Sequence, residues 1–406
     1  MNHIDELITE HCPDGVSFQM LGDVTTKAAG IKWSTLDAGE ERCYIDLSSV
    51  DRVTKKIGET LAVNSSNAPS RARQIVKTND VIFATTRPAQ MRWALITPEY
   101  DDQVASTGYC VLRPRTELIL PAFLAHVLGS KSFQRYVEAN QIEGNYPSIP
   151  DSRVRAFKAP IPPLEVQRAI IEILDTFSKL EAELEAELEA RKQQYEHYRA
   201  ELLTSAESAE WSTLGAVSSK VSSGGTPSSG NASYYGGDIP WLRTQEVNFD
   251  VITSTGVSIT EAGFKNSSAK WIPENCVIVA MYGATAAKVA INAIPLTTNQ
   301  ACCNLQIDDS IAEYRYVFHW ISNQYEKLKS LGEGSQSNLN AKKVKDFPIP
   351  VPPLEEQRRI VGILDKCDAL VNDLSVGLPA ELAARRQQYE YYRDKLLTFN
   401  EQEAAA

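Results

Sequence analysis

The chain has 406 residues, of which 43% are apolar, and a formal net charge of −11 at pH 7. This length suffices for two or more domains with buried cores. No apolar run approaches the length of a membrane span, and residues 1–10 lack the apolar core of a secretory signal, so we expect neither a membrane protein nor a secreted one. The seven cysteines are scattered without a C-x-x-C pair, which favours reduced thiols in a cytoplasmic protein.

The surplus of negative charge is concentrated in two segments. Residues 159–208 carry a net charge of −6 and residues 348–406 carry −3, whereas residues 1–158 and 209–347 carry −1 each. The two near-neutral segments can each present a basic face locally, so the overall charge does not exclude a nucleic acid as partner.

Residues 1–158 alternate short β-branched runs with turns, which is typical of a mixed domain. The pattern predicts strands within 42–50, 74–85 and 103–113, with Asn79-Asp80 as a turn, and then a helix over 121–139. We therefore expect a first α/β domain over residues 1–158.

Several polar side chains of this domain are candidates for binding nucleic acid. Arg and Gln can read guanine and adenine edges through two hydrogen bonds, and Arg87, Gln90 and Arg92 follow directly after a predicted strand, where a rigid scaffold can carry them. For any single residue, a solvated surface role is the alternative. The candidates are Arg71, Arg73, Lys77, Arg87, Gln90, Arg92, Asn145, Tyr146 and Arg153.

Residues 159–208 read as one long helix. Its second proline, Pro163, suits a first helical position, and apolar residues such as Ile170 and Leu174 then recur at helical spacing. Such a helix of about forty residues would be roughly 60 Å long. A four-residue unit, Leu-Glu-Ala-Glu, repeats from Leu180 onward; it can act as a spacer through its length or can simply be a solvated helix face.

Residues 209–347 repeat the outline of the first domain with different contents. A strand over 274–280 and a helix over 313–331 correspond to the second strand region and the helix of the first domain. Val154 and Phe157 return as Val344 and Phe347, each 190 positions later. Similar frames with different contents indicate one task performed on two targets.

The candidates in the second domain are mostly hydroxyl, amide and lysine side chains. A loop rich in Gly, Ser and Tyr over 223–238 could approach a phosphate backbone closely, although a flexible surface loop has the same composition. For Lys342 and Lys343 the alternative is that they are solvated lysines at the start of a helix. The candidates are Thr226, Ser228, Tyr234, Tyr235, Arg243, Tyr282, Thr285, Lys288, Asn299, Gln300, Gln336, Asn338, Lys342 and Lys343.

Residues 348–406 are a second copy of the long helix, with a break at Gly377 and Pro379. Because each copy has an apolar stripe and needs a partner of similar length, we expect the two helices to pair as an antiparallel coiled coil. The five histidines are scattered, and no catalytic or metal-binding motif is found, so we expect no enzyme and no metal site. The fold class is then α+β, with two α/β domains in an internal pseudo-two-fold repeat, separated by two long antiparallel helices.

Over essentially its whole length the chain resembles the specificity subunits of type I restriction-modification systems. The resemblance rests on Pro-Pro-Leu-Glu-x-Gln-Arg at Pro162 and Pro352, and on Arg-x-Gln-Gln-Tyr-Glu-x-Tyr-Arg at Arg191 and Arg385. It also rests on Thr226-Pro227 with the run 236–242, on the run 282–285 and on the run 298–302. Short repeats like those after Leu180 resemble one subgroup, in which their number sets the spacing of half-sites.

The resemblance implies target-recognition domains at 1–158 and 209–347, with conserved helical spacers at 159–208 and 348–406. It implies sequence-specific binding of double-stranded DNA at an asymmetric bipartite site, one half-site per domain, without catalysis by this chain. The implied partners are two modification subunits that use S-adenosylmethionine and restriction subunits that use ATP and Mg; no cofactor is expected on this chain. The alternatives are a free-standing DNA nuclease or recombinase with a coiled-coil spacer, and a structural scaffold that binds no DNA.

Overall fold

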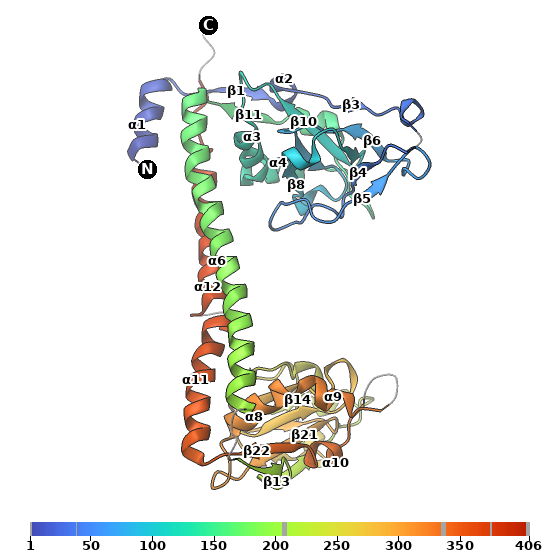
Figure 1. The fold of residues 1–406 in the computed structure, drawn as a ribbon, viewed down its shortest axis with the longest axis vertical. Helices are drawn as coiled ribbons and strands as arrows, with labels where there is room; N and C mark the ends of the chain where they lie inside the picture. Colours follow the sequence, from blue (N-terminus) through green and yellow to red (C-terminus); the bar gives the residue numbers. More distant parts are fainter. Residues whose placement is uncertain (1, 38, 205–208, 334–337, 374–375, 403–406) are drawn as a thin grey trace. The chain divides into compact units, whose positions relative to one another are not determined.

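The computed structural model describes residues 2–37, 39–204, 209–333, 338–373 and 376–402. The chain divides into two compact units (Figure 1). Unit 1 consists of Met1–Leu184 and Leu382–Ala406, and unit 2 consists of Glu185–Glu381. The long helix α6 (Leu164–Thr204) contributes its first half to unit 1 and its second half to unit 2.

Unit 1 contains a four-stranded sheet in the order β2-β10-β7-β8, a five-stranded sheet in the order β3-β6-β9-β4-β5, and a β1-β11 ribbon. Its strands are β1 Ser17–Met20, β2 Thr25–Thr26, β3 Ala29–Gly30, β4 Arg42–Ile45, β5 Leu61–Val63, β6 Ala72–Ile75, β7 Val81–Ala84, β8 Trp93–Leu95, β9 Val104–Ser106, β10 Tyr109–Pro114 and β11 Lys158–Ile161. Its helices outside the spacers are α1 Asn2–His11, α2 Leu21–Val24, α3 Pro121–Gly129, α4 Lys131–Asn140 and α5 Asp151–Arg155, with short 3-10 turns η1 Trp33–Thr35, η2 Pro88–Gln90 and η3 Pro98–Tyr100.

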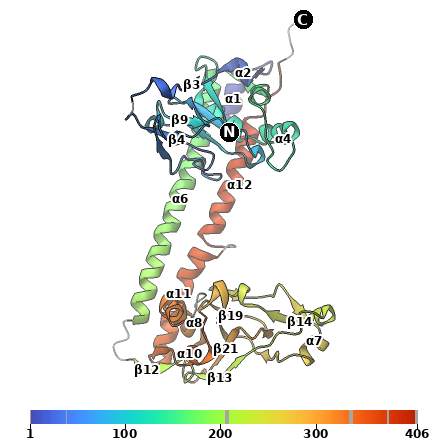
Figure 2. The same cartoon turned by 90° about the vertical axis from the view of Figure 1, so that its right-hand side faces the viewer.

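Unit 2 contains a five-stranded sheet in the order β13-β21-β18-β19-β15, a four-stranded sheet in the order β16-β14-β20-β17, and a β12-β22 ribbon. Its strands are β12 Glu210–Thr213, β13 Ser218–Ser223, β14 Tyr235–Leu242, β15 Val251–Ile252, β16 Ser258–Ile259, β17 Trp271–Ile272, β18 Val277–Ala280, β19 Val289–Asn292, β20 Leu296–Thr298, β21 Cys302–Ile307 and β22 Pro348–Val351. Its helices outside the spacers are α7 Glu261–Lys265, α8 Tyr314–Asn323, α9 Tyr325–Ser330 and α10 Ala341–Lys345, with 3-10 turns η4 Ala232–Tyr234, η5 Thr244–Glu246 and η6 Gly283–Thr285. Helix α8 packs on the sheet that contains β18 and β19 (Figure 2).

The strand order of unit 1 recurs in unit 2. The neighbours β2, β10, β7 and β8 correspond to β13, β21, β18 and β19. The other large sheet of each unit also corresponds. In unit 1 this sheet contains the parallel pair β4 and β9, and in unit 2 it contains the parallel pair β14 and β20.

The strands expected over 42–50 and 274–280 are confirmed with shorter bounds, as β4 and β18, and the segment 74–85 contains the end of β6 and all of β7. The strand expected over 103–113 is two strands, β9 and β10, which belong to different sheets. The helix expected over 313–331 is two helices, α8 and α9. The helix predicted over 121–139 is two helices, because the hydroxyl of Ser130 accepts a hydrogen bond from the N–H of Phe133 and begins α4.

A buried glutamine explains the repeated Pro-Pro-Leu-Glu-x-Gln-Arg motif. The amide oxygen of Gln167 accepts a hydrogen bond from the N–H of Leu120 at 2.9 Å, and its NH₂ donates to the carbonyls of Leu118 and Pro162 at 2.9 and 2.8 Å. Gln357 makes the same set of bonds in unit 2. Since the side chain satisfies three backbone groups, each glutamine ties the start of a spacer helix to the helix region of its own domain.

Each half of α6 packs against a different helix. In unit 1 the partner is α12 (Leu378–Leu396), which lies along α6 (Figure 1). The rings of Phe177 and Tyr392 stack at 5.4 Å, and Glu181 pairs with Arg386 at 2.6 Å. Because the contact position rises along α6 as it falls along α12, these two segments run in opposite directions. In unit 2 the partner is α11 (Leu354–Asn372), within a core cluster that includes Tyr195, Leu203, Ile360, Leu364 and Val371.

The predicted apolar stripes are only partly correct. Ile170, Leu174, Ile360 and Leu364 are buried. For the next turn of α6 the spacing predicts Leu180 or Leu184; Leu180 is 48% exposed and Leu184 is half-buried, and in α11 Leu370 is 42% exposed. Tyr198 is also exposed, and at the end of α6 Leu203 rather than Leu202 is fully buried. Leu374 lies outside the described residues. The expected break of the second copy is confirmed, since α11 ends at Asn372 and α12 begins at Leu378.

The histidines and cysteines near the core have structural surroundings. His126 lies 3.1 Å from the hydroxyl of Tyr389, and His319 lies 2.7 Å from the carboxylate of Asp365, so each joins its domain to a spacer helix of the same unit. All seven cysteines are free, and burial raises the pKa of the Cys110 thiol to about 12. Five of them are buried and pack as small apolar residues, as expected, whereas Cys43 and Cys367 are half-buried.

Candidate nucleic-acid interface

Loops from three parts of unit 1 meet where β7 ends. The N–H of Thr85 donates to the carbonyl of Gly108 at 2.8 Å, and the carbonyl of Thr85 accepts from the N–H of Ile149 at 2.9 Å. The N–H of Arg87 donates to the carbonyl of Pro147 at 2.7 Å. Backbone hydrogen bonds therefore fix the loops around residues 86–92, 107–108 and 142–149 beside one another.

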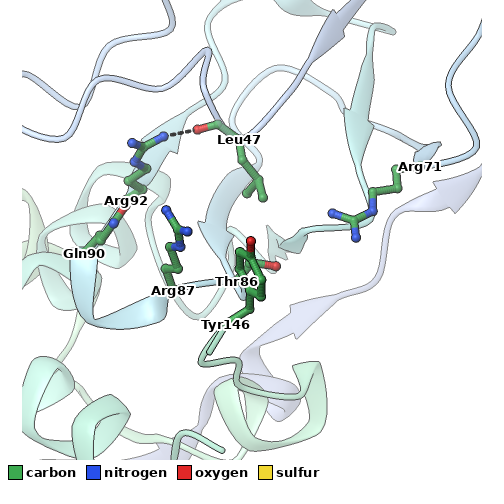
Figure 3. A pocket seen from close by; sticks show the side chains of 7 residues that line it. All are labelled: Leu47, Arg71, Thr86, Arg87, Gln90, Arg92 and Tyr146. Carbon is green, nitrogen blue, oxygen red and sulfur yellow. Dashed lines mark hydrogen bonds between the residues drawn. The ribbon is translucent and has the colours of Figure 1, made fainter. Parts of the chain in front are cut away.

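These loops surround a cavity of about 520 Å³ (Figure 3). Five of its seven lining residues are candidates named from the sequence, and they come from three separate segments of the chain. The lining carries three guanidinium groups and no carboxylate, so it favours an anionic or hydrogen-bond-accepting partner. The lining residues are Leu47, Arg71, Thr86, Arg87, Gln90, Arg92 and Tyr146.

Two of the arginines at the cavity differ in how they are held. Arg92 donates from Nη1 to the carbonyl of Leu47, so part of its guanidinium already has a structural role (Figure 3). Arg87 instead lies over the ring of Tyr146, 5.2 Å from its centre, and that ring is 71% exposed. The backbone of Arg87 is left-handed, with φ of 50°, which is costly for a residue with a Cβ. Such strain at an exposed arginine is typical of a functional position.

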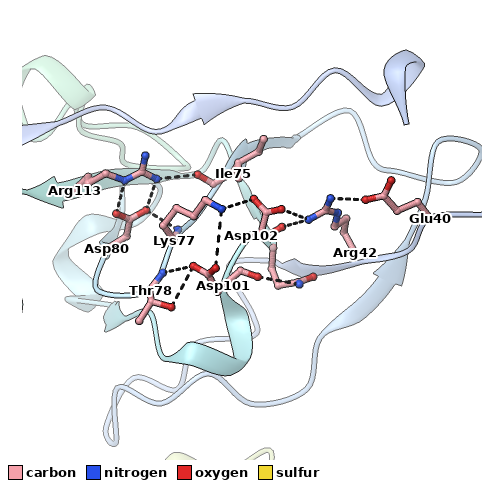
Figure 4. Close-up of polar contacts among 10 residues, drawn as sticks. Glu40, Arg42, Ile75, Lys77, Thr78, Asp80, Asp101, Asp102 and Arg113 are labelled. Carbon is pink, nitrogen blue, oxygen red and sulfur yellow. Dashed lines mark hydrogen bonds and ion pairs between the residues drawn. The ribbon is translucent and has the colours of Figure 1, made fainter. Parts of the chain in front are cut away.

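Other candidates in unit 1 lie apart from the cavity. The ammonium of Lys77 is 2.8 Å from the carboxylate of Asp102, which also pairs with Arg42 at 2.7 Å (Figure 4). Hydrogen bonds from Lys77 and then from Arg42 hold the pKa of Asp102 below its usual range. Arg73 donates to the carbonyl of Ser70, Arg153 donates to the carbonyl of Asn140, and Asn145 is exposed next to Tyr146.

Unit 2 has the same hydrogen bonds at the end of β18. The N–H of Met281 donates to the carbonyl of Ala301, and the carbonyl of Met281 accepts from the N–H of Leu339, both at 2.8 Å. The hydroxyl of Thr285 donates to the carbonyl of Thr244 at 2.8 Å. The candidates Arg243, Tyr282, Thr285, Asn299 and Gln300 therefore belong to loops that meet at this strand end.

The glycine-rich loop of unit 2 packs closely on neighbouring backbone. A Cβ on Gly224 would lie 1.8 Å from the carbonyl oxygen of Thr298, and a Cβ on Gly225 would lie 2.4 Å from Ser268. These glycines therefore permit close packing of the loop. Next to them, the hydroxyl of Thr226 donates to the side-chain oxygen of Gln300.

The remaining candidates of unit 2 have mixed surroundings. The hydroxyl of Tyr235 donates to the carbonyl of Pro227, Lys288 donates to the side chain of Asn248, and Lys343 pairs with Glu333. The other described candidates are Tyr234, half-buried in η4; Ser228 and Lys342, both exposed; and Asn338, whose backbone pairs with Glu333. Gln336 lies outside the described residues.

Sequence reasoning missed a basic segment close to the cavity. The hairpin at residues 50–57 contains Arg52, Lys55 and Lys56, and the ammonium of Lys55 donates to the carbonyl of Met91 at 2.5 Å. The signal was present as three cations within five positions after a predicted strand. Nothing in the sequence, however, indicates that this segment lies beside residues 86–92.

The described residues offer no metal site and no membrane span. No group of three or more His, Cys, Asp or Glu side chains there could hold a metal ion. None of the helices described is long and apolar enough to cross a membrane.

Comparison with known proteins gives one family. The model of the type I restriction modification DNA specificity domain matches residues 21–190 and again residues 208–384. The EcoR124I/EcoR124II specificity subunit of Escherichia coli is 38% identical over 252 residues, which cover 60% of this chain and 62% of that relative. The chain thus matches somewhat less than two thirds of that relative's length.

Two further matches cover more of the chain. A putative type I restriction enzyme specificity subunit of Haemophilus influenzae is 30% identical over 301 residues, covering 68% of this chain and 72% of that one. A chain solved in work on complex assembly and conformational transition of the type I R-M system is 25% identical, with a TM-score of 0.68, and covers 95% of this chain and 98% of that one. With two matches to the family model and a mixed α/β fold built on a long helix, the chain belongs to the family of type I restriction-modification specificity subunits.

Proposed function

We propose that this chain is the DNA-recognition subunit of a type I restriction-modification enzyme and performs no catalytic step itself. The observation that carries the proposal is the duplicated strand-end arrangement. In each unit, matching backbone hydrogen bonds gather loops rich in base-reading side chains at the end of β7 or β18. A duplicated scaffold with different side chains is suited to reading two different DNA sequences.

The first recognition domain, residues 1–158, reads one half-site, and the second, residues 209–347, reads another. In the first domain Arg71, Arg87 and Gln90 reach base edges from the cavity, where guanidinium groups favour guanine and an amide favours adenine. In the second, the reading groups are the hydroxyl and amide side chains of Tyr282, Thr285 and their neighbours. The recognised site is therefore bipartite and asymmetric.

The spacers, residues 159–208 and 348–406, form an antiparallel coiled coil that relates the two domains by a pseudo-two-fold axis. The contacts of α6 with α12 in unit 1 and with α11 in unit 2 support this pairing. One four-residue unit lengthens a helix by about 6 Å and turns it by about 40° beyond a full turn. The number of Leu-Glu-Ala-Glu units therefore sets the distance between half-sites.

The spacer helices also bind the partner subunits. Their surface keeps several large apolar side chains exposed, including Leu180, Ile363, Leu370 and Tyr391. Exposed apolar residues rimmed by charges are typical of protein interfaces. Two modification subunits that use S-adenosylmethionine dock there, and restriction subunits that use ATP and Mg complete the enzyme.

The test is to map methylated adenines in the genome of cells that carry this chain with its modification and restriction partners. We expect one bipartite motif with two dissimilar halves and a fixed gap. A continuous or palindromic motif would contradict the proposal of two different readers. Methylation by the purified chain alone would contradict the proposal that it performs no catalytic step.

A further inference from the structure

The segment that sequence reasoning missed is a tight hairpin in the connection between β4 and β5. Residues Val50 and Ile57 pair as an antiparallel bridge, and the N–H of Asp51 donates to the carbonyl of Lys56 at 2.9 Å. We refer to residues 50–57 as the basic hairpin. It is closed at its base by main-chain bonds, so its tip has a defined position relative to the sheet.

Internal hydrogen bonds make the tip of the basic hairpin rigid. One carboxylate oxygen of Asp51 accepts from the N–H groups of Val53 and Thr54 at 2.8 and 2.7 Å, and from the Thr54 hydroxyl at 3.1 Å. The hydrogen bonds from Thr54 and Val53 lower the pKa of Asp51, so its negative charge is used inside the turn. Lys55 follows with a left-handed backbone, φ of 58°, which turns the chain back.

Lys55 joins the basic hairpin to the loop that lines the cavity. Its ammonium donates to the carbonyl of Met91 at 2.5 Å and to the carbonyl of Arg52 at 2.7 Å, and it lies 5.8 Å from the ring centre of Trp93. Met91 directly follows Gln90 and precedes Arg92, both of which line the cavity. The hairpin is therefore held beside the base-reading cavity.

The outward side chains of the basic hairpin are unused by the fold. Arg52 and Lys56 are exposed, and within the described part of the chain neither side chain takes part in a hydrogen bond or ion pair. Val53, next to Arg52 at the tip, is 62% exposed. By contrast Lys77, another exposed cation of this domain, is paired with Asp102. Two unpaired cations therefore stand on a turn whose backbone is already ordered, which lowers the cost of binding an anion there.

The second domain lacks this feature. The corresponding connection between β14 and β16, residues 243–257, has one cation, Arg243 at its start, which pairs with Glu246 at 3.6 Å, and residues 244–257 contain no Lys or Arg. The basic hairpin therefore belongs to the first domain alone, rather than to the frame that both domains share.

We propose that the basic hairpin is a second DNA contact of the first domain, in which Arg52 and Lys56 bind backbone phosphates beside the half-site. This inference rests on the proposed function. It assigns to the basic hairpin a salt-dependent part of the affinity for DNA. Phosphate contacts fix register and strength without reading sequence. Val53, between them, lies against the sugar edges of the groove.

The experiment uses the full chain assembled with its modification subunits, and a duplex that carries the methylated motif mapped in cells. The dissociation constant is measured at several salt concentrations for the wild type and for the Arg52→Ala/Lys56→Ala double variant. Each phosphate contact contributes about 0.9 to the slope of log K against log salt. We expect the double variant to lose about two from that slope and roughly tenfold in affinity near 0.15 M salt. The methylated motif should stay unchanged.

A matched control removes the same charges elsewhere in unit 1. Arg115 is exposed just after the end of β10 that is farther from the cavity, about 20 Å along the strand, and Lys158 is exposed at the start of β11; neither lines the cavity. The Arg115→Ala/Lys158→Ala variant should keep the wild-type slope. A charge-preserving Arg52→Lys/Lys56→Arg variant should restore most of the slope, which excludes a folding defect as the cause.

Two negative results can be told apart. If the wild-type assembly binds the duplex and the Arg52→Ala/Lys56→Ala variant matches it in slope and affinity, the inference is wrong and the proposed function stands. If the wild-type assembly with its partners binds no duplex, the proposed function fails and the inference fails with it.

Discussion

The two recognition domains share a backbone frame and differ in what that frame carries. At the end of β7 and of β18 the same pair of backbone hydrogen bonds fixes the loops, and the residue two positions later has a positive φ in both. In the first domain that residue is Arg87, with φ of 50°; in the second it is Gly283, with φ of 79°. Glycine adopts this conformation without strain, so the arginine is present at an energetic cost.

This difference separates the residues that build the frame from those that we propose to read DNA. Main-chain pairing and the buried glutamines are duplicated, whereas the side chains at the strand ends are cationic in one domain and mostly hydroxyl and amide groups in the other. The comparison predicts that frame residues have equal effects in both units and that reading residues affect one half-site only.

The largest expected effect comes from the buried glutamines. Gln167→Leu leaves one N–H and two carbonyl groups without a partner in unit 1, and Gln357→Leu does the same in unit 2. We expect each to lower the free energy of unfolding by about 3 kcal/mol or more. Urea denaturation measures the loss, with Gln134→Leu as a near-neutral control, because among the described residues the half-buried side chain of Gln134 bonds only to the side chain of Glu138. A large loss in one unit only would show that the two motifs are not equivalent.

The next effect is the pH dependence that the half-buried Lys55 gives to the free energy of unfolding. Lys55 has a pKa of about 8, lowered from 10.5 first by burial and then by the nearby Arg393. Because the unfolded chain holds this proton more tightly, unfolding takes up a proton between about pH 8 and 10.5, and the free energy of unfolding rises with pH there. Relative to Lys55→Met, the wild type should gain about 1–2 kcal/mol over this range, after allowance for partial solvation of the ammonium.

Denaturation series at several pH values test this behaviour of Lys55. Below pH 8 the difference between wild type and Lys55→Met should be constant. The exposed neighbour supplies a control, because Lys56→Met should give no such trend. A flat difference from pH 7 to 10.5 would mean that Lys55 is not buried against the loop that carries Met91.

The smallest expected change in stability comes from separate substitutions at the two positive-φ positions, Arg87 and Gly283. Arg87→Gly should raise the free energy of unfolding by about 1 kcal/mol because it relieves backbone strain, and Gly283→Ala should lower it by a similar amount. Arg87→Gly should also change function. It should relax the sequence specificity of methylation in one half-site and leave the other half-site unchanged. Unaltered methylation at both half-sites would remove Arg87 from the reading residues.

Much of the frame could be predicted because it is written twice in the sequence. The long helix α6, the break before α12 and the strand runs around β7 and β18 follow from periodicity, prolines and repeats. The stripe along α6 was harder, because its Leu-Glu-Ala run offers several leucines at nearly equivalent angles. Which of them is buried depends on the partner helix, and Leu180 is left exposed.

The sequence allowed candidate residues of the site to be named, but it did not indicate which of them lie close together in space. Arg71 and Arg87 both follow from residue type, yet their meeting at one cavity with Tyr146 depends on long-range pairing of three segments. The ion pair of Lys77 with Asp102 could not be foreseen for the same reason, since the two residues are distant in sequence, and the DNA contact of Lys77 stays a prediction. The basic hairpin escaped notice because its importance comes from one contact, between Lys55 and Met91.

The central claim is that two unlike readers are held on a shared frame at a distance set by the spacer. The most direct measurement is methylome sequencing of cells whose chain lacks one unit, residues 184–187, from the repeat in α6. The account predicts the same two half-site sequences separated by a different gap. Changed half-site bases with an unchanged gap would contradict it.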